Sequence, residues 1–380
     1  MIAVRVLFAG IAIFWTAVVL RVRRSRKESR WRLGPDSPVD VALPPLVVVI
    51  PARDEATVIA ACIGHVGASD HPDLEVVVFD DGSTDGTGAL AAHAGARVIS
   101  GGGEPLPEGW KGKPWALQRA TRGLDAEWIL FLDADVQVHP AALSRTHAYV
   151  VREQVDLLSG FGRLSMESFW EKVIQPSVGG LILAGNDLDA VNDPARPDRM
   201  IANGQFILVR RAAYEAVGGH EAVRDDILDD VGMAKAFVAK GLVVRCLFLR
   251  ELFTCRMYTD LRSLWYGWTK NLYAGMGYRL DRVAFLVGFV VLEFVVPYVA
   301  VLVGAALGDA EVVLGGLGLV AFIQIVRLWL DGIFEQDRRY GLLQVLGAVM
   351  LVGLLVDSAR RSRAGTVLWK GRRYATRPTG

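Results

Sequence analysis

The chain has 380 residues and a formal net charge of +1, and 52% of its residues are hydrophobic. The near-neutral charge excludes bulk electrostatic attraction to nucleic acid, so no nucleic-acid partner is expected, and the length allows one large domain or two. The three cysteines lack the spacing of a zinc or redox site, which favours reduced thiols; a disulfide between Cys246 and Cys255 is the alternative.

The N-terminus begins with a hydrophobic run from Ile2 to Leu20, which has the length that a helix needs to cross a bilayer. The basic segment Arg21–Lys27 follows, and the positive-inside rule places such a segment in the cytoplasm. A cleaved signal peptide is the alternative, but its charge would precede the hydrophobic run. Residues 1–20 are therefore predicted to form a transmembrane helix, and residues 21–44 a basic, proline-rich linker.

Hydrophobic stretches near the C-terminus predict a membrane region of two to three helices over residues 283–357. Val283–Leu307 and Val312–Leu330 are long enough to span a bilayer, whereas Leu342–Val356 is slightly short. A cytoplasmic central domain followed by three full spans would leave the basic tail, residues 358–380, on the outside, against the positive-inside rule. Either the third stretch is re-entrant or interfacial, or the charge rule fails for this tail.

The central residues 45–282 alternate short hydrophobic runs with helical patterns of about ten residues. This alternation predicts an α/β domain with a mostly parallel, doubly wound sheet, whose ligands bind at the carboxyl ends of the strands. The predicted strands are residues 46–50, 75–79, 97–99, 128–132, 207–210 and 243–246, and the predicted helices are residues 55–66, 84–94, 113–123 and 229–240. The apolar segment Phe169–Ala184 is either a buried helix or one that lies on the membrane surface.

Two pairs of carboxylates directly follow predicted strands. Asp133 and Asp135 come after residues 128–132, and carboxylates at this spacing can reach one hard cation. Asp80 and Asp81 follow the earlier run that ends at residue 79. Each pair would also suit a local turn or helix cap. Their joint placement at strand ends favours a divalent metal that holds a diphosphate, which is typical of a nucleotide-using enzyme.

Three further positions are candidates for binding or chemistry. Asp229 and Asp230 open a predicted helix, where acids are stabilised by the helix dipole, or where one acts as a general base for an acceptor hydroxyl. Lys113 also lies at a helix start and suits a phosphate, with a solvated loop charge as the alternative. Gly204, followed by Gln205, permits close approach of a substrate or makes a turn.

An aromatic and cationic segment precedes the first C-terminal hydrophobic stretch. It contains Trp265, Trp268 and Lys270. Such a segment is typical of an interfacial aromatic belt, and it also suits an acceptor or diphosphate site at the membrane surface. One segment can serve both purposes, so both interpretations are kept.

The order of these motifs resembles glycosyltransferase family 2, of the GT-A fold, over residues 45–275. Residues 51–55 look like the opening nucleotide-binding segment of that family, with Asp54 where asparagine is usual. The turn at residues 80–85 is similar to its nucleotide-binding turn, and Gly112 before the lysine resembles its glycine–lysine pair. Asp-Ala-Asp at residues 133–135 resembles its metal-binding motif, and the acids at 229 and 230 stand where the family has Glu-Asp.

The resemblance implies an inverting transfer of one sugar from a nucleotide-diphosphate sugar. Asp135, together with Asp133, would bind Mg²⁺ or Mn²⁺, and Asp230, beside Asp229, would be the catalytic base. The predicted donor-binding residues are Pro51, Arg53, Glu55, Asp80, Asp81, Lys113, Asp133, Gly204 and Gln205.

The processive, membrane-embedded members of the family carry a Gln-x-x-Arg-Trp motif, which this chain lacks; it has residues 268–271, Trp-Thr-Lys-Asn, instead. The chain looks closer to bacterial enzymes that glycosylate carotenoid acids or other polyprenoid lipids, and to hopanoid-associated glycosyltransferases. That implies a lipid acceptor and a multi-pass protein of the plasma membrane with a cytoplasmic catalytic domain. The alternatives are a processive polysaccharide synthase and a non-catalytic nucleotide-binding or scaffold protein. The oligomeric state is not predicted.

Overall fold

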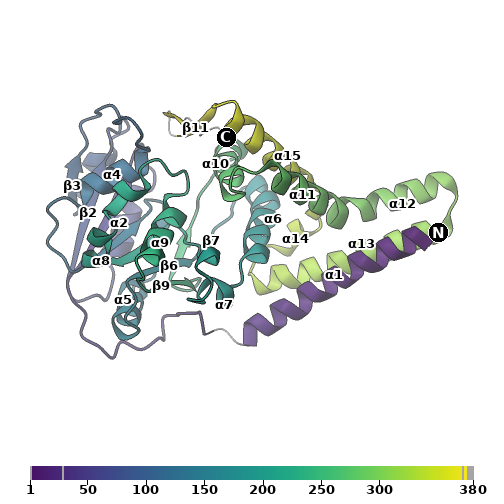
Figure 1. Cartoon of the computed structure of the whole chain (residues 1–380), viewed down its shortest axis with the longest axis horizontal. Coiled ribbons are helices and arrows are strands. Elements are labelled where there is room, and N and C mark those ends of the chain that lie inside the picture. The colour runs from purple at the N-terminus through teal and green to yellow at the C-terminus, as the bar shows by residue number, and fades with distance from the viewer. Residues whose placement is uncertain (1, 28–29, 370–371, 375–380) are drawn as a thin grey trace. The chain divides into compact units, whose positions relative to one another are not determined.

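A computed structural model describes residues 2–27, 30–369 and 372–374 of the chain. The chain divides into two compact units, whose elements are labelled in Figure 1. The sheet unit comprises residues 31–165 and 186–257, and the helical unit comprises residues 1–30, 166–185 and 258–380.

The sheet unit is built on a seven-stranded sheet with the order β3-β2-β1-β4-β8-β6-β9. The strands β1 to β4 run parallel, whereas β8 runs antiparallel to both of its neighbours, β4 and β6. The mostly parallel sheet expected from the sequence is confirmed, although β6 was not predicted because Ser159 and Gly160 interrupt its hydrophobic run. The strands are β1 Leu46–Ala52, β2 Leu74–Asp80, β3 Arg97–Ser100, β4 Trp128–Leu132, β6 Leu157–Phe161, β8 Phe206–Arg210 and β9 Val244–Phe248.

Two hydrophobic cores lie on the two faces of this sheet, which explains the continuous apolar run of β1. Val48 and Ile50 face one core, and Val47 and Val49 face the other. Burying one such side chain fully stabilises the fold by about 1.5–3 kcal/mol. The first core includes α2 (Ile59–Gly67), α3 (Thr87–His93) and α5 (Ala142–Arg152), and the second includes α4 (Gly112–Ala120), α8 (Arg211–Ala216) and α9 (Asp229–Ala239).

A smaller sheet joins β5 (Val136–Val138), β10 (Phe253–Cys255) and β7 (Arg163–Leu164) in the order β5-β10-β7. In the antiparallel pair of β10 with β5, Cys255 lies opposite Val136. This register brings Cys255 next to Asp135, the residue that precedes β5. The short elements α7 (Leu188–Val191), η1 (Pro197–Arg199) and η2 (Gly219–Val223) complete the sheet unit.

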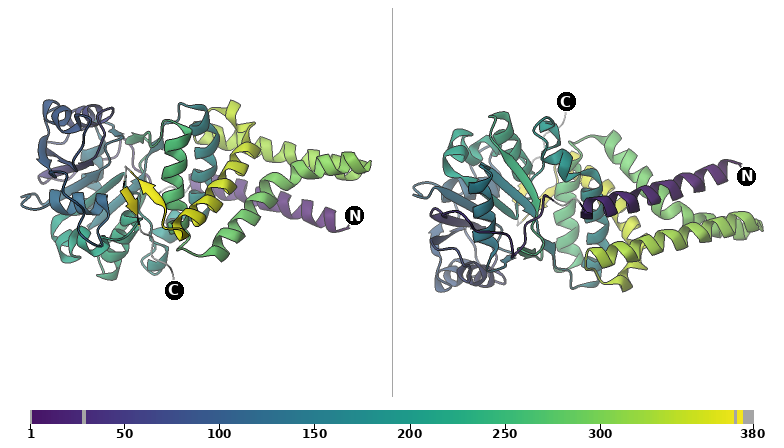
Figure 2. Two further views of the ribbon diagram at one scale, coloured as in Figure 1. Left: turned by 90° about the horizontal axis from the view of Figure 1, so that it is seen from above. Right: turned by 90° about the horizontal axis from the view of Figure 1, so that it is seen from below.

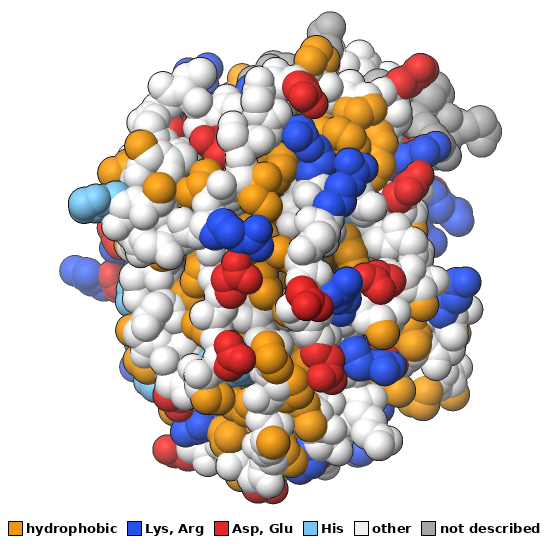
Figure 3. Space-filling model, turned by 90° about the vertical axis from the view of Figure 1, so that its left-hand side faces the viewer, with side chains coloured by type: hydrophobic (Ala, Val, Ile, Leu, Met, Phe, Trp, Pro, Cys, Tyr) orange, Lys and Arg blue, Asp and Glu red, His pale blue; other side chains and the backbone are white. Residues whose placement is uncertain are grey.

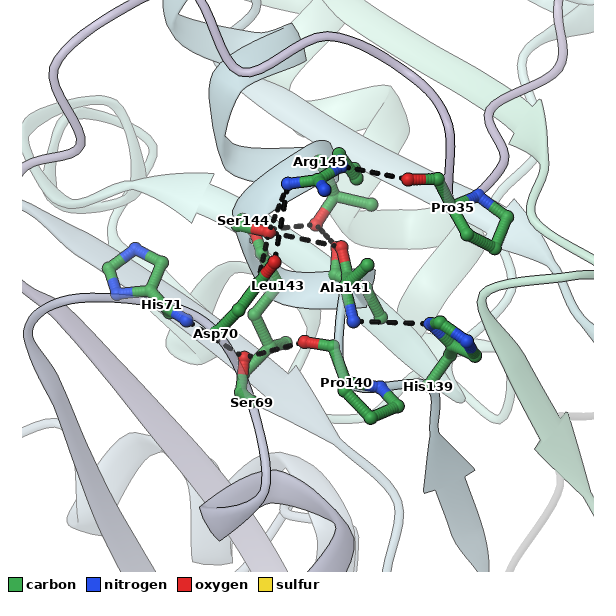
Figure 4. Close-up of polar contacts among 12 residues, drawn as sticks. Pro35, Ser69, Asp70, His71, His139, Pro140, Ala141, Leu143, Ser144 and Arg145 are labelled. Carbon is green, nitrogen blue, oxygen red and sulfur yellow. Dashed lines mark hydrogen bonds and ion pairs between the residues drawn. The ribbon is translucent and has the colours of Figure 1, made fainter.

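The segment predicted as a linker packs against the sheet unit after residue 30. Arg32 forms a β-bridge with Phe248, and Leu33 is buried. Further along, Nε of Arg145 donates a hydrogen bond to the carbonyl oxygen of Pro35 over 2.9 Å, as Figure 4 shows. The connection between the first helix and the sheet is therefore anchored at both its start and its middle.

Acidic, basic and hydrophobic side chains are interspersed on the face of the molecule shown in Figure 3. No single sign of charge dominates that face, in keeping with the net charge of +1. All three cysteines lie within the described residues as free, buried thiols, so the disulfide considered from the sequence does not form.

Within the described residues, three helical segments of the helical unit are long and apolar enough to cross a membrane: Ile2–Arg24, Leu280–Leu307 and Ala310–Ile333. The first belongs to α1 (Ile2–Lys27), and the third is α13. The second consists of α11 (Leu280–Val290), a π-helical turn η3 (Val291–Val295) and α12 (Val296–Leu307).

These candidate spans pack with a consistent direction. At the beginning of the helices, Arg5 of α1 forms an ion pair with Glu311 of α13, and near their ends Arg23 lies 5.7 Å from the ring centre of Trp329. The two helices are therefore parallel, as Figure 2 also shows. The turn at Gly308 connects α12 to α13 as an antiparallel hairpin. The basic residues that follow the first candidate span, precede the second and follow the third therefore lie at one end of this helical bundle.

The third hydrophobic stretch near the C-terminus is part of α15 (Gln344–Arg363), which is not among the candidate spans in the described residues. It packs against α6 (Phe169–Gly185) and α10 (Leu261–Gly275). Oγ of Ser358 donates to the carbonyl oxygen of Thr269 over 2.6 Å. Two candidate spans therefore follow the sheet unit in the described part of the chain, Leu280–Leu307 and Ala310–Ile333.

The remaining helical-unit elements are α14 (Arg338–Gly341) and a short hairpin of β11 (Val367–Trp369) and β12 (Arg372–Tyr374). The segments that contain α6 and α10 group with the helical unit rather than with the sheet. This division differs from the expected single domain over residues 45–282. The reason is that both helices bury one face against α15, a contact that lies far away in sequence.

Candidate active site

Two loops at the carboxyl ends of β1 and β2 are joined by side chains. Asp54 adopts a positive φ of 53°, a conformation that asparagine, aspartate and glycine tolerate best. Its backbone N–H donates to Oγ of Ser83 over 2.9 Å, and its Oδ1 accepts from the N–H of Thr84 over 2.9 Å. Asp54 therefore joins the loop after β1 to the loop after β2.

A second acid reinforces the same contact. Oδ2 of Asp85 accepts a hydrogen bond from the N–H of Ala56 over 3.0 Å, and its Oδ1 accepts from the N–H of Thr87. The N–H of Glu55 donates to Oγ1 of Thr87 over 2.8 Å. Because residues up to 58 form this loop, α2 begins at Ile59, later than the predicted start at residue 55.

The predicted donor-binding acids Asp80 and Asp81 have different surroundings. Oδ1 of Asp80 accepts from the N–H of Ser83 over 2.8 Å, so this carboxylate is engaged in the turn. Asp81 is buried, and its carbonyl oxygen accepts from Nη1 of Arg53 over 2.6 Å. At the following Gly82, with φ of 71°, a Cβ atom would lie 2.7 Å from the Cα of Gly103, so the turn closes against that loop only with glycine.

Asp133 and Asp135 lie beyond the end of β4, as predicted. The N–H of Asp133 donates to the carbonyl oxygen of Gln205 over 3.1 Å, which joins the ends of β4 and β8. Oδ1 of Asp133 lies 2.5 Å from Nζ of Lys113. Burial, with the carboxylates of Asp133 and Glu55, raises the pKa of Asp135 to about 7.

The donor set at these acids fits a divalent cation. Oδ1 of Asp135 is buried, and no residue in the described part of the chain hydrogen-bonds it. A buried carboxylate oxygen without a donor is the kind of ligand that a hard cation takes, and the cation would offset the cost of burying the charge. The described residues contain no group of three His, Cys, Asp or Glu side chains arranged to hold a metal.

Lys113, at the start of α4, links the acidic pair to the predicted base. Its Nζ also donates to the carbonyl oxygen of Gly204 over 3.0 Å, and the N–H of Gly204 donates to Oδ2 of Asp230 over 2.8 Å. Burial lowers the pKa of Lys113, but the carboxylates of Asp133, Asp229 and Asp230 outweigh burial and raise it. The lysine is therefore a permanent cation at the centre of four acids.

Asp230 has the environment of a proton acceptor. Burial and the neighbouring Asp229 raise the pKa of Asp230 to about 6, while the positive charge of Lys113 opposes the increase. A Cβ atom on Gly204 would lie 3.3 Å from Oδ2 of Asp230 and 3.1 Å from Nζ of Lys113, so a side chain there would crowd both groups. Gly204 also lies in the turn that leads into β8, where the N–H of Phe206 donates to the carbonyl oxygen of Asn203 over 3.4 Å.

Gln205 and Cys255 form a polar connection behind the acidic pair. Nε2 of Gln205 donates to Sγ of Cys255 over 3.2 Å. Burial and the nearby carboxylate of Asp135 raise the pKa of the Cys255 thiol well above its usual range. Sequence reasoning missed the role of Cys255, because only the pairing of β10 with β5 brings it to the site.

Trp265, Trp268 and Lys270 belong to α10 in the helical unit, which the sheet unit's cluster does not include. Nε1 of Trp268 donates to Oε1 of Gln175 over 3.0 Å, and the indole is buried. Nε1 of Trp265 donates to Oδ2 of Asp357 over 2.9 Å. Both tryptophans fasten α10 to neighbouring helices, and their predicted contact with an acceptor stays a prediction.

Comparison with known proteins identifies the sheet unit. Residues 47–218 match the family described as glycosyl transferase family 2. The chain is 27% identical over 235 residues to a 4,4'-diaponeurosporenoate glycosyltransferase of Staphylococcus aureus strain MRSA252. The match covers 61% of this chain and 62% of that relative, so less than two thirds of the relative's length is matched. The corresponding enzyme of strain USA300 matches to the same extent.

Among solved structures, the chain is similar to the mannosyltransferase PcManGT from Pyrobaculum calidifontis in complex with GDP-Man and Mn²⁺. The TM-score is 0.52 at 18% identity, and the match covers 93% of this chain and 98% of that protein. This likeness shows the fold. The GT-A fold and the family 2 resemblance expected from the sequence are both confirmed.

Proposed function

We propose that this chain is a glycosyltransferase of family 2, and that it transfers a single sugar from a nucleotide-diphosphate sugar to a polyprenoid or carotenoid-like lipid at the cytoplasmic face of the plasma membrane. The observation that carries the proposal is the cluster of Asp133, Asp135, Lys113 and Asp230, joined through the backbone of Gly204. Strongly perturbed acids around one lysine are typical of a functional site rather than of a structural ion pair.

The donor would bind beside the acidic cluster, at the two hydrogen-bonded loops that follow β1 and β2. Arg53, Glu55 and Asp81 lie on the loops after β1 and β2, at the carboxyl end of the parallel strands, where open α/β sheets bind nucleotides. Lys113 would support the diphosphate from the start of α4, since a half-buried cation there would complement the phosphate charge.

Asp135 and Asp133 would hold Mg²⁺ or Mn²⁺. Oδ1 of Asp135 would be a ligand, because no hydrogen bond from the described residues occupies it. Such a cation offsets the negative charge that builds up on the leaving diphosphate. Lys113 supplies a second positive charge. This charge lies close to the cation site, since Nζ of Lys113 is 2.5 Å from Oδ1 of Asp133.

The sugar transfer proposed is a single displacement with inversion. An oxygen of the acceptor bonds to the anomeric carbon while the bond from that carbon to the diphosphate oxygen breaks. Where the acceptor is a hydroxyl, its proton passes to Asp230, whose pKa near 6 leaves it ionised at neutral pH. Where the acceptor is a carboxylic acid, it is ionised already and Asp230 contributes less.

The lipid acceptor and the cytoplasmic orientation are supported by the helical unit and by the relatives. The bacterial relative is named for transfer to 4,4'-diaponeurosporenoate. Arg21 at the end of the first candidate span and Arg279 before the second flank the same end of the bundle, the end at which the chain continues into the sheet unit. The positive-inside rule puts that end in the cytoplasm, where nucleotide-sugars are made.

The test is donor turnover by purified protein in detergent, with UDP-, GDP- and dTDP-sugars, Mn²⁺ or Mg²⁺, and total membrane lipid as acceptor. A lipid product that carries one sugar, and that is lost in Asp135→Asn, is the expected result. A long polymer would instead support a processive synthase. Absence of binding and turnover with every donor would favour the non-catalytic binding or scaffold protein.

A further inference from the structure

The second candidate span contains a buried acid, Glu293, which the proposed steps of sugar transfer do not use. Its side chain is 5% exposed, and no residue in the described part of the chain hydrogen-bonds its Oε2. Hydrocarbon offers no water to satisfy such an atom, so an unpaired carboxyl oxygen there costs free energy. Acids inside membrane-spanning helices are rare, and they typically belong to sites for ligands or ions. Glu293 therefore needs an explanation beyond packing.

The π-helical turn that carries Glu293 is explained by a proline. Pro297 has no N–H to donate to the carbonyl oxygen of Glu293, four residues earlier, and in a regular α-helix its ring would clash with that carbonyl. The helix widens instead over Val291–Val295. Turns of this kind recur at functional sites. The proline accounts for the backbone, but it does not require an acid at position 293, where a leucine would fill the same space.

Glu293 faces the interior of the helical unit, whereas its neighbours face outward. Val290, Glu293 and Pro297 are all buried, and their spacing of three and four residues places them on one face of the helix. The π-helical turn packs against α15. By contrast, Val291 and Leu292 are each 37% exposed. A lipid chain that lies against these two side chains is therefore adjacent to the residue that carries the carboxyl group.

Two further polar atoms lie at the same level of the helical bundle. The ring of Phe294 packs against that of Trp15 in α1, with centres 5.2 Å apart, and the Tyr298 hydroxyl accepts a hydrogen bond from Nε2 of Gln324 in α13 over 2.7 Å. Nε1 of Trp15 and Oε1 of Gln324 are both buried, and neither has a hydrogen-bond partner among the described residues. Each of the three candidate spans therefore contributes an unpaired polar atom near this level.

The level of Glu293 lies within the hydrocarbon region. Trp15 precedes Arg24, the end of the first candidate span, by about 14 Å at a helical rise of about 1.5 Å per residue. A hydrocarbon core is about 30 Å thick, so Glu293 lies in the half next to the basic end of the bundle. A phosphate or an ionised acid is costly to bring there, whereas one hydroxyl group on an apolar chain is not. A hydroxyl group both donates and accepts, which suits Oε2 of Glu293 and Nε1 of Trp15.

We propose that Glu293 is the hydrogen-bond acceptor of an intramembrane site for the hydroxyl group of a polyprenoid alcohol, and that Trp15 supplies a donor at the same level. The proposal rests on the proposed function for the class of its ligand, and it narrows that class. A lipid with a free hydroxyl group binds at this site, whereas an ionised carotenoid acid has no hydrogen to donate to Glu293. The site takes the acceptor from the bilayer, so it acts on lipid binding rather than on the transfer step.

The test measures binding of a fluorescent long-chain polyprenol to the full chain in lipid nanodiscs, together with KM and kcat for the same lipid. We expect Glu293→Leu to weaken polyprenol binding about tenfold and to raise KM by a similar factor, with kcat and donor affinity close to normal. Glu293→Gln keeps an acceptor oxygen and should bind the polyprenol almost normally. Trp15→Phe keeps the ring but loses the N–H, and we expect about threefold weaker binding.

Glu311→Leu is the matched control. It removes another carboxylate from the candidate spans, one that is half-exposed and forms an ion pair with Arg5. We expect it to leave polyprenol binding unchanged. Thermal unfolding of each variant establishes that it is folded. Because Glu293→Leu removes an unpaired buried oxygen, it should be at least as stable as the unmodified protein, so unfolding would not explain its weaker binding.

The outcomes separate this proposal from the proposed function. Unchanged polyprenol binding in folded Glu293→Leu, with turnover lost in Asp135→Asn, would overturn the lipid site and keep the glycosyltransferase. Equal, Glu293-dependent binding of a polyprenol and a carotenoid acid would overturn the preference for a hydroxyl group. A dimer that dissociates in Glu293→Leu would also overturn the site, because the carboxyl group would then contact a second copy. Glu293-dependent polyprenol binding by a protein that turns over no donor would uphold the lipid site and overturn the proposed function.

Discussion

The two units of the molecule arrange their charged side chains differently. In the helical unit, acids lie beside bases: Nε of Arg327 donates to Oδ1 of Asp331 over 2.8 Å, and Asp357 accepts from Arg361 and Trp265. In the sheet unit, the acids Asp133, Asp135, Asp229 and Asp230 lie around one lysine, Lys113.

The arrangement of charges indicates which unit binds a charged ligand. Where an acid of the helical unit lies beside a base, the two charges offset each other and a ligand would add little. Gathering like charges in the sheet unit disfavours the empty site, because the carboxylates repel one another and are partly desolvated. A cation and a diphosphate would relieve that repulsion, so the unfavourable arrangement is the one that suits a substrate.

The largest effect is expected for Asp135→Asn, which removes the charge that would hold the cation. Loss of several kcal/mol of charge stabilisation would lower turnover by a factor on the order of 1,000. The measurement is donor turnover across a Mn²⁺ titration. Asp125→Asn is the control, because the Asp125 side chain is fully exposed and its ion pair with Arg211 spans 3.5 Å. Equal activity and metal dependence in both variants would remove the metal assignment.

Asp230→Asn distinguishes the two classes of acceptor. With a hydroxyl acceptor, loss of the base should lower kcat by a factor on the order of 100 or more. With a carboxylic acid acceptor, the same variant should retain most of its activity. The measurement is kcat with a polyprenol and with a carotenoid acid as acceptors. An equal, large loss with both would show that Asp230 acts by some means other than proton removal.

Gly204→Ala should lower activity about tenfold, because a 1 Å displacement of catalytic groups is costly. The added Cβ would lie 3.1 Å from Nζ of Lys113. The control is Gly180→Ala in α6, where a Cβ would meet nothing within 4 Å. Activity and thermal unfolding of both variants are measured together. If Gly180→Ala lowered activity more than Gly204→Ala, the absence of a side chain at position 204 would not be what the acidic cluster requires.

In the helical unit, Trp268→Phe should reduce stability without altering donor binding. It removes the hydrogen bond to Oε1 of Gln175, a buried group, at a cost of about 1–3 kcal/mol. The measurements are thermal unfolding in detergent and donor affinity. Leu302→Ala, at a side chain that is 71% exposed in α12, is the control. Weakened donor affinity in Trp268→Phe would contradict the separation of roles between the units.

The smallest effect concerns two buried histidines of the sheet unit. Nε2 of His71 and Nδ1 of His147 lie 2.9 Å apart, and burial lowers the pKa of both, that of His147 to about 3. In the unfolded chain these histidines bind protons with the ordinary pKa of 6.5. Their contribution to stability is therefore fully present above that pH, and it is lost as the pH decreases toward 3.

The check is the urea midpoint of unfolding at about pH 7 and about pH 5, the range in which unfolded histidines take up protons. His147→Gln should show a shallower dependence on pH, since one of the two buried histidines is gone. An identical slope in the variant would mean that other groups cause the loss of stability at low pH.

Much of the fold could be predicted from the sequence because its strands are buried on both faces. The continuous apolar run of β1 predicts such a strand, and its side chains do alternate between two cores. β6 was missed because Ser159 and Gly160 break the pattern. The grouping of α6 and α10 with the helical unit was not predicted, because amphipathicity does not specify which partner a helix will cover.

The residues at strand ends could be read from local patterns: Asp133 and Asp135 follow β4 because a hydrophobic strand must end before two charges. Which of these residues meet depends on how the strands are arranged in space. Gly204 lies between Lys113 and Asp230 because β8 returns antiparallel beside β4, and Cys255 reaches Asp135 through the pairing of two three-residue strands. Such contacts depend on strand order and register, which local residue patterns do not specify.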